Sequence, residues 1–307
     1  MIEKSKYIGC FLGLAMGDAY GAVYEGGILE KFVWSLIGKT KGKLRYTDDT
    51  QMSIDLAKSF LENKEINQDK LAMSFANSYR WSRGYGVGAA WLLKNIKKGG
   101  NWNELNVAKY KDGSFGNGAA MRAPILALCY SDDIKVLIKN VKKASEITHA
   151  NILAIEGAML IAISTYGALK NWDNEMILKE LLIYSTLDDY KKKINLCIKY
   201  INETNGVNNK IIKENLGNGI AAINSTITAI YFALKHRNDS HNIMFKEIFS
   251  LSGDTDTIGA MAGGIWGAFN GAEKLDNKKA NRIEDYKEIK ELAGKLWEYN
   301  KEKSLHY

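Results

Sequence analysis

The chain has 307 residues, of which 46% are apolar, 42 are Lys or Arg and 35 are Asp or Glu. This length is enough for a large hydrophobic core, and the absence of a Ser/Gly/Pro-rich linker favours one domain covering residues 1–307. The net charge of +7 comes from lysines spread along expected helix faces, which is typical of a solvated surface. Nucleic acid is therefore not an expected partner, although the charge would help to attract a phosphate-bearing substrate.

The cysteine count and the N-terminal segment indicate the compartment. Three widely spaced cysteines do not make a disulfide framework, so we expect reduced core residues. The apolar segment 8–17 is followed by Asp18 and Glu25 and lacks a convincing cleavage site, so we interpret it as a buried helix rather than a signal peptide. We expect no apolar run of membrane-spanning length. A cytoplasmic protein without a membrane partner follows, and we expect it to be a monomer.

The first expected helix covers about residues 5–23 and carries a glycine at every fourth position. These glycines are Gly9, Gly13, Gly17 and Gly21. Such a row lets a neighbouring helix come close, at a propensity cost of roughly 1 kcal/mol per glycine, so we expect this helix at the centre of the fold. It ends in a glycine-flanked turn that holds Glu25. From the residues alone, a lone loop glutamate is most often solvated.

Two short acidic segments, 47–50 and 252–257, lie some two hundred residues apart. Each places two carboxylates and flanking threonines directly before a run that reads as helical. Helix capping explains either segment alone. Brought together, the four carboxylates would repel one another strongly unless a cation lay between them. Oxygen ligands of this kind suit Mg²⁺ first, with Mn²⁺ or Ca²⁺ as alternatives.

Two glycine-rich segments predict a close approach between backbone and ligand. In segment 83–88, glycines at alternate positions favour a loop over a helix interior. Segment 113–122 opens another expected helix, where backbone N–H groups can hold an anion such as a phosphate. It matches neither the P-loop nor the dinucleotide fingerprint. Tyr110 and Phe115 flank it, and either ring could stack on a base or pack in the core.

Helical periodicity covers most of the rest of the chain, and strand-like alternation is scarce, so we predict an all-α fold. The expected helices are 68–81, 132–146, 151–169, 173–184, 191–202, 219–235, 243–251 and 284–301, in addition to those that follow the acidic and glycine-rich segments. His149 lies between two of them. It could be a cap, a satisfied core histidine or a substrate contact.

Five pieces of sequence, in their order and spacing, resemble the ADP-ribosylglycohydrolase family, the dinitrogenase-reductase-activating-glycohydrolase-like proteins. The pieces are segments 17–25, 47–50, 113–122, 148–149 and 252–257, and the resemblance extends over about residues 5–272. It implies a compact orthogonal helical bundle around the glycine-rich helix, with two Mg²⁺ ions in a cleft. It also implies hydrolysis of the bond between the anomeric carbon of ADP-ribose and a protein side chain or small acceptor.

The same resemblance implies roles for individual residues. As metal ligands it implies Thr47, Asp48, Asp49, Asp254, Asp256 and Thr257. As catalytic residues it implies Glu25, on a mobile loop, together with Asp48 and Asp49. As contacts to the diphosphate and ribose it implies Gly84, Ser114, Gly116, Asn117 and His149, and as contacts to the adenine Phe115 and Tyr110.

Segment 113–122 resembles the branch of the family that acts on O-linked ADP-ribose, such as serine adducts and O-acetyl-ADP-ribose, more than the arginine-specific branch. Phe115 departs from the pattern, because this branch often has Tyr there. Two other functions stay open on the residues: a metal-dependent pyrophosphatase or phosphoesterase, and a non-catalytic ADP-ribose-binding protein on the same fold.

Overall fold

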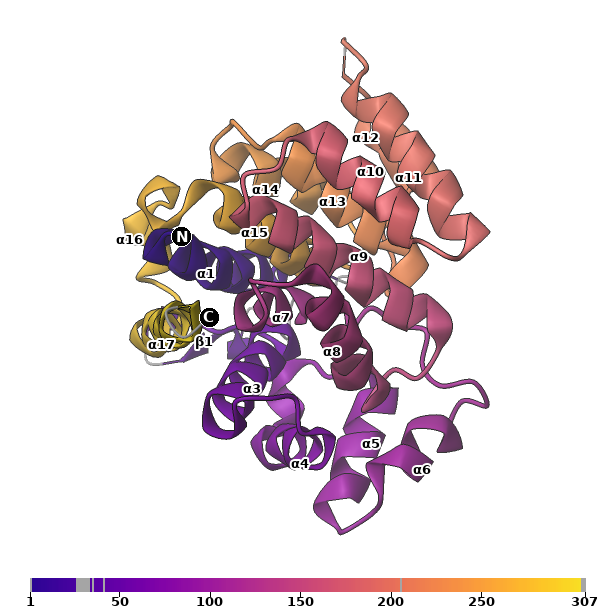
Figure 1. Cartoon of the computed structure of the whole chain (residues 1–307), viewed down its shortest axis with the longest axis vertical. Coiled ribbons are helices and arrows are strands. Elements are labelled where there is room, and N and C mark those ends of the chain that lie inside the picture. Colours follow the sequence, from indigo (N-terminus) through magenta and orange to yellow (C-terminus); the bar gives the residue numbers. More distant parts are fainter. Residues whose placement is uncertain (1, 26–33, 35, 41, 205, 305–307) are drawn as a thin grey trace.

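Two glycine-lined helices, α1 (Lys4–Gly21) and α15 (Thr255–Asn270), pack along each other through the middle of the molecule (Figure 1). In this computed structural model, which describes residues 2–25, 34, 36–40, 42–204 and 206–304, the two backbones touch at the glycine row. A Cβ atom added to Gly13 would lie 2.2 Å from the carbonyl oxygen of Gly263, and one added to Gly17 would lie 2.0 Å from that of Gly259. The expected close approach of a second helix is confirmed.

The fold is all-α, as predicted, and the other helices surround the central pair (Figure 1). They are α3 (Asp48–Asn63), α4 (Gln68–Ser78), α5 (Val87–Lys97), α6 (Trp102–Ala108), α7 (Ala123–Cys129), α8 (Ile134–Glu146), α9 (Ile152–Leu169), α10 (Asn174–Tyr184), α11 (Asp188–Ile201), α12 (Asn209–Asn215), α13 (Thr226–Lys235), α14 (His241–Ser250), α16 (Asn277–Ala280) and α17 (Tyr286–Ser304). Short 3₁₀ turns cover Trp81–Arg83, Ala222–Asn224 and Ala272–Lys274. The strands β1 (Lys39–Thr40) and β2 (Lys43–Leu44) pair antiparallel, with Lys39 opposite Leu44.

Helix α9 corrects the expectation that no apolar run reaches membrane-spanning length. Its 18 residues have a mean hydropathy of 1.7, and by length and composition it is the one helix of the described residues that could cross a membrane. However, 78% of this stretch is buried inside the protein, and α7, α8, α13 and α15 pack against it. A buried core helix passes the same test of length and composition, so α9 is explained as part of the core.

The predicted helix over 219–235 is wrong in its first part. Helix α13 begins at Thr226, because the backbone of the preceding residues is used elsewhere. The N–H of Asn117 donates to the carbonyl of Ile220 at 2.9 Å, and the N–H of Ala222 donates to that of Phe115 at 3.0 Å. The segment before α13 is therefore tied to the glycine-rich segment 113–122.

Helices α5, α6, α12 and α16 were not predicted, and the loop expected over 83–88 is wrong at its end. Gly88 lies in the first turn of α5, whereas Gly84 and Gly86 precede the helix. Gly84 has a φ of 80°, a left-handed conformation that glycine adopts without strain.

Candidate active site

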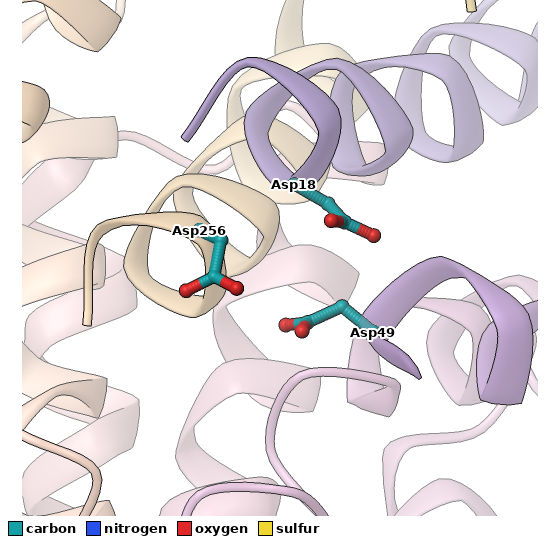
Figure 2. Close-up of side chains that lie close together, drawn as sticks. All are labelled: Asp18, Asp49 and Asp256. Atoms are coloured by element: carbon teal, nitrogen blue, oxygen red, sulfur yellow. The ribbon is translucent and has the colours of Figure 1, made fainter. Parts of the chain in front are cut away.

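The acidic residues meet where three helix ends come together. Asp18 lies near the end of α1, Asp49 in the first turn of α3 and Asp256 in the first turn of α15, and Figure 2 shows their side chains converging. One carboxylate oxygen from each lies within 4.8 Å of those of the other two. Asp256 also belongs to a second group of this kind, with Glu25 and Asp254. The two acidic segments and the Glu25 turn are therefore parts of one site.

A cleft of about 430 Å³ opens at these carboxylates. Most of the predicted site residues line it: Glu25, Asp48, Asp49, Gly84, Tyr110, Ser114, Gly116, Asn117, His149, Asp254, Asp256 and Thr257. Thr47 is buried, with 3% of its surface exposed, at the N-cap of α3. Phe115 is 51% exposed, next to the lining residues Ser114 and Gly116, so its ring is not a core side chain.

The two carboxylate oxygens of Asp49 differ in their hydrogen bonds to the described residues. Its Oδ2 accepts a hydrogen bond from the Thr47 hydroxyl at 2.9 Å and one from the Thr257 hydroxyl at 3.5 Å. Its Oδ1 is buried and has no hydrogen-bond partner among the residues that the structure describes. A buried carboxylate oxygen without a partner is costly unless a cation or a water satisfies it. The donor set, carboxylates and threonine hydroxyls, fits a hard divalent cation.

Burial and the charges of neighbouring carboxylates raise the pKa values of the acidic residues. Burial, followed by the charges of Asp18 and Glu25, raises the pKa of Asp48 to about 8. Burial and the neighbouring acids raise the pKa of Asp49 and that of Asp256 as well. Helix capping needs one acceptor at each helix start, not a cluster that holds protons. A cation among these carboxylates would favour their ionised forms and so lower their pKa values.

Asp18 is an acidic residue of the site that sequence reasoning missed. It is fully buried, and its carboxylate accepts hydrogen bonds from the N–H of Thr47 at 2.9 Å and from the N–H and hydroxyl of Thr50 at 3.0 and 2.5 Å. It thus shapes the turn that presents Asp48 and Asp49. The available signal was a charged residue inside an otherwise apolar, glycine-lined helix, since buried carboxylates are rare unless they have partners.

A buried ion pair between Arg83 and Glu284, called the clamp below, binds the residue that precedes this turn, Tyr46. The guanidinium group of Arg83 lies 3.9 Å from the ring centre of Tyr46, donates to the Tyr46 carbonyl at 2.7 Å and pairs with Glu284. Glu284 in turn accepts from the N–H of Tyr46 at 3.0 Å. Since Thr47 and Gly84 follow Tyr46 and Arg83 directly, the clamp fixes two parts of the cleft wall together.

Ring stacking positions the turn that carries Glu25. The ring of Tyr24 stacks on Phe249 of α14, with centroids 5.1 Å apart and planes at 15°, and Phe249 stacks on Phe245. The glycines that follow Glu25, Gly26 and Gly27, lie outside the described residues, so the predicted mobile hinge stays a prediction.

Asn117 connects the glycine-rich segment to the acidic site. Its side-chain amide donates to Asp254 and, at 3.0 Å, to the hydroxyl of Ser225. Asp254 is further held by its own N–H, which donates to the carbonyl of Asn218 at 2.9 Å. The glycine-rich segment 113–122 and the carboxylates therefore form adjoining walls of the cleft.

Fold and cleft together define an all-α protein with an acidic site beside a glycine-rich wall, and comparisons with known proteins give the family. The family model for ADP-ribosylglycohydrolase matches residues 2–305. The ADP-ribosylhydrolase ARH3 of Gallus gallus is 32% identical, with 96% of this chain and 93% of that protein covered, and ARH3 of Homo sapiens is 31% identical, with 95% and 93% covered. The solved structure of an ADP-ribosylglycohydrolase-related protein complex has the same fold, with a TM-score of 0.69 at 21% identity over 96% of this chain and 98% of its own.

The chain therefore belongs to the ADP-ribosylglycohydrolase family. It is an enzyme, a glycosyl hydrolase that acts on ADP-ribosyl bonds.

Proposed function

We propose that this enzyme is Mg²⁺-dependent and removes ADP-ribose from an O-linked acceptor, a serine side chain or an acetyl group, in preference to arginine. The observation that carries the metal dependence is the buried Oδ1 of Asp49, unpartnered among the described residues, within a cluster of converging carboxylates. Two ions would be held by Thr47, Asp48, Asp49, Asp254, Asp256 and Thr257. Mn²⁺ would serve as a substitute, because it accepts the same oxygen ligands.

Different residues of the chain bind the substrate and move the proton. The glycine-rich wall, with Ser114, Gly116 and Asn117, binds the diphosphate through backbone N–H groups and side-chain donors. When bound, the ions supply positive charge that polarises the ribose hydroxyls and a water molecule. Glycosidic cleavage passes through an oxocarbenium-like state, which a nearby carboxylate assists by moving a proton. Glu25, which shares the site with Asp254 and Asp256, is our candidate for this step.

The preference for O-linked substrates rests on the sequence of segment 113–122, which resembles that branch of the family. The test is incubation of the protein with serine-linked, arginine-linked and O-acetyl-linked ADP-ribose, with Mg²⁺ and with a chelator. We expect intact ADP-ribose to be released faster from the serine and O-acetyl substrates than from the arginine substrate, and no product with the chelator. Faster release from the arginine adduct would overturn the proposed preference, and undiminished release with the chelator would overturn the proposed metal dependence.

Product analysis also separates the other two functions. Formation of AMP, with ribose 5-phosphate left on the acceptor, would indicate a pyrophosphatase, and binding without turnover would indicate an ADP-ribose-binding protein. Glu25→Gln is the matched variant. We expect it to lower turnover by about 10²-fold or more, the size of a lost general acid–base group, with ADP-ribose binding retained.

A further inference from the structure

The cleft residue His149 ends a chain of hydrogen bonds that begins at a buried arginine. Arg122 is 1% exposed, and its Nη2 donates to the hydroxyl of Thr148 at 2.8 Å and to the carbonyl of Ala144 at 3.0 Å. Its Nη1 donates to the carbonyl of Gly118. The oxygen of Thr148 then lies 2.7 Å from Nδ1 of His149. Neither Arg122 nor Thr148 has a part in the function proposed above.

The direction of these hydrogen bonds fixes where the imidazole proton must be. Arg122 has only donors, so the Thr148 oxygen accepts from it. Among the described residues, the other hydrogen bond of the Thr148 hydroxyl is the one to His149. If the oxygen accepted from His149 as well, the buried hydroxyl proton would have no acceptor among these residues, so the arrangement that satisfies it donates to Nδ1. With Nδ1 as the acceptor, a neutral imidazole carries its proton on Nε2.

Two further observations agree with a neutral ring held in one place. Burial and the nearby charge of Arg122 lower the pKa of His149 to about 3, so the ring is uncharged near neutral pH. The ring also lies directly on the glycine-rich wall: a Cβ atom added to Gly118 would be 2.6 Å from Cε1 and 2.9 Å from Nε2 of His149. No side chain larger than a hydrogen fits there without displacing the imidazole.

We propose that Arg122 and Thr148 are positioning residues that hold His149 as the neutral Nε2–H tautomer, so that it donates a hydrogen bond to an oxygen of the ADP-ribose diphosphate or ribose. The identity of this acceptor rests on the proposed function, whereas the tautomer rests on the hydrogen bonds alone. A donor suits this place, because phosphate oxygens accept hydrogen bonds and do not donate them. The opposite tautomer would present a lone pair and repel them.

The test uses the full-length protein with ¹⁵N-labelled histidine. The chain has four histidines, so the His149 signals are assigned by their absence in His149→Gln. Long-range ¹H–¹⁵N correlation spectra at pH 7.5 should show a protonated Nε2 and an unprotonated Nδ1 in the wild type. Thr148→Val, which keeps the shape but removes the hydroxyl, should lose this pure state, whereas Thr148→Ser should keep it. A proton on Nδ1 in the wild type, or an unchanged tautomer in Thr148→Val, would overturn the proposal.

Binding of ADP-ribose, measured by calorimetry on the same proteins, tests the consequence. We expect about tenfold weaker binding in Thr148→Val, the size of one hydrogen bond to a charged group, and wild-type affinity in Thr148→Ser. Equal affinity in both variants would overturn the donor role. If the wild type itself failed to bind ADP-ribose, the proposed ligand would be wrong, and the spectra would still decide the tautomer.

Discussion

Asp18 shows how much of the site depends on a single buried side chain. Its carboxylate only accepts, and it faces the N–H groups of Thr47 and Thr50. Asp18→Asn turns an amide toward those donors and removes a charge from the cluster, so we expect at least tenfold weaker Mg²⁺ binding and reduced turnover. Thermal shift with increasing Mg²⁺ measures the effect.

Glu156→Gln is the matched control for Asp18→Asn. Glu156 is 3% exposed and its carboxylate also accepts several hydrogen bonds, from Ser185, Thr186 and Leu187, but it lies outside the acidic site. This variant should lose stability while its Mg²⁺-dependent shift stays as in the wild type. An undiminished Mg²⁺ shift in Asp18→Asn would remove Asp18 from the site.

Phe115 was expected either to stack on a base or to pack in the core, and its exposed side chain excludes the core. With half of its surface exposed, Phe115→Ala should change stability by no more than about 0.5 kcal/mol. If the ring stacks on the adenine, the same change should weaken ADP-ribose binding by about 1–3 kcal/mol, measured by calorimetry. The buried Phe60→Ala serves as a contrast, with an expected stability loss of about 3–5 kcal/mol. Unchanged affinity in Phe115→Ala would leave Tyr110 as the candidate for the adenine contact.

At the scale of elements, the contact between α1 and α15 sets the position of the acidic site. A Cβ atom at Gly13 would overlap the backbone of Gly263, and backbone cannot move aside as a side chain can. We expect Gly13→Ala to lower the free energy of unfolding by about 3 kcal/mol or more, the upper end for overpacking. Gly219→Ala is the control, since no atom of the described residues would lie within 4 Å of a Cβ there. Similar denaturation midpoints for the two variants would contradict the close contact.

The contact between α3 and α4 should make stability depend on pH. Asp55 of α3 is 5% exposed and accepts from Ser78 of α4 and from Gln51. Burial raises its pKa to about 6. Because the folded pKa is above the unfolded value of about 3.9, the folded state binds the proton more tightly. The resulting stabilisation is complete below about pH 4 and is lost as the pH rises through 6.

Asp55→Asn removes this titration. Relative to the wild type, its free energy of unfolding should therefore rise by about 2 kcal/mol between pH 4 and pH 7, at 1.36 kcal/mol per pKa unit. Urea titrations of both proteins at several pH values measure the difference. A difference that stays constant over this range would show that Asp55 titrates normally.

How far the sequence predicts the elements depends on whether their signals are local. The row of glycines at every fourth position predicted the central helix. The excess of carboxylates in each of two short segments predicted that they share one site. Each of these signals lies within a few neighbouring residues. Residues 219–225 have helix-compatible side chains, yet their backbone pairs with segment 113–122, a tertiary contact that no local pattern reports. Asp18 differs, because a charge in an apolar helix is a local signal, but its partners lie about thirty residues away, so the sequence did not show what its carboxylate holds.

For the molecule as a whole, the proposed metal site requires that carboxylates from three helix ends share cations. Asp49 and Asp256 come from α3 and α15, and one carboxylate oxygen of each lies within 4.8 Å of that of the other and of Asp18. Burial and mutual repulsion raise the pKa of both groups. The metal-free protein must therefore hold protons or tolerate repulsion at the centre of its fold, and cations should stabilise it substantially.

The most direct measurement is the melting temperature of the wild type and of Asp256→Asn with and without Mg²⁺. Mg²⁺ at a hundredfold excess over Kd should stabilise the wild type by about 2.7 kcal/mol, because it binds only the folded state. Asp256→Asn should lose both this shift and the hydrolysis, while its metal-free form melts no lower than that of the wild type, since one repelling charge is gone. Asn caps a helix nearly as well as Asp. A wild type without a Mg²⁺-dependent shift, together with a variant of unchanged behaviour, would show that the aspartates only cap helices and would contradict the metal site.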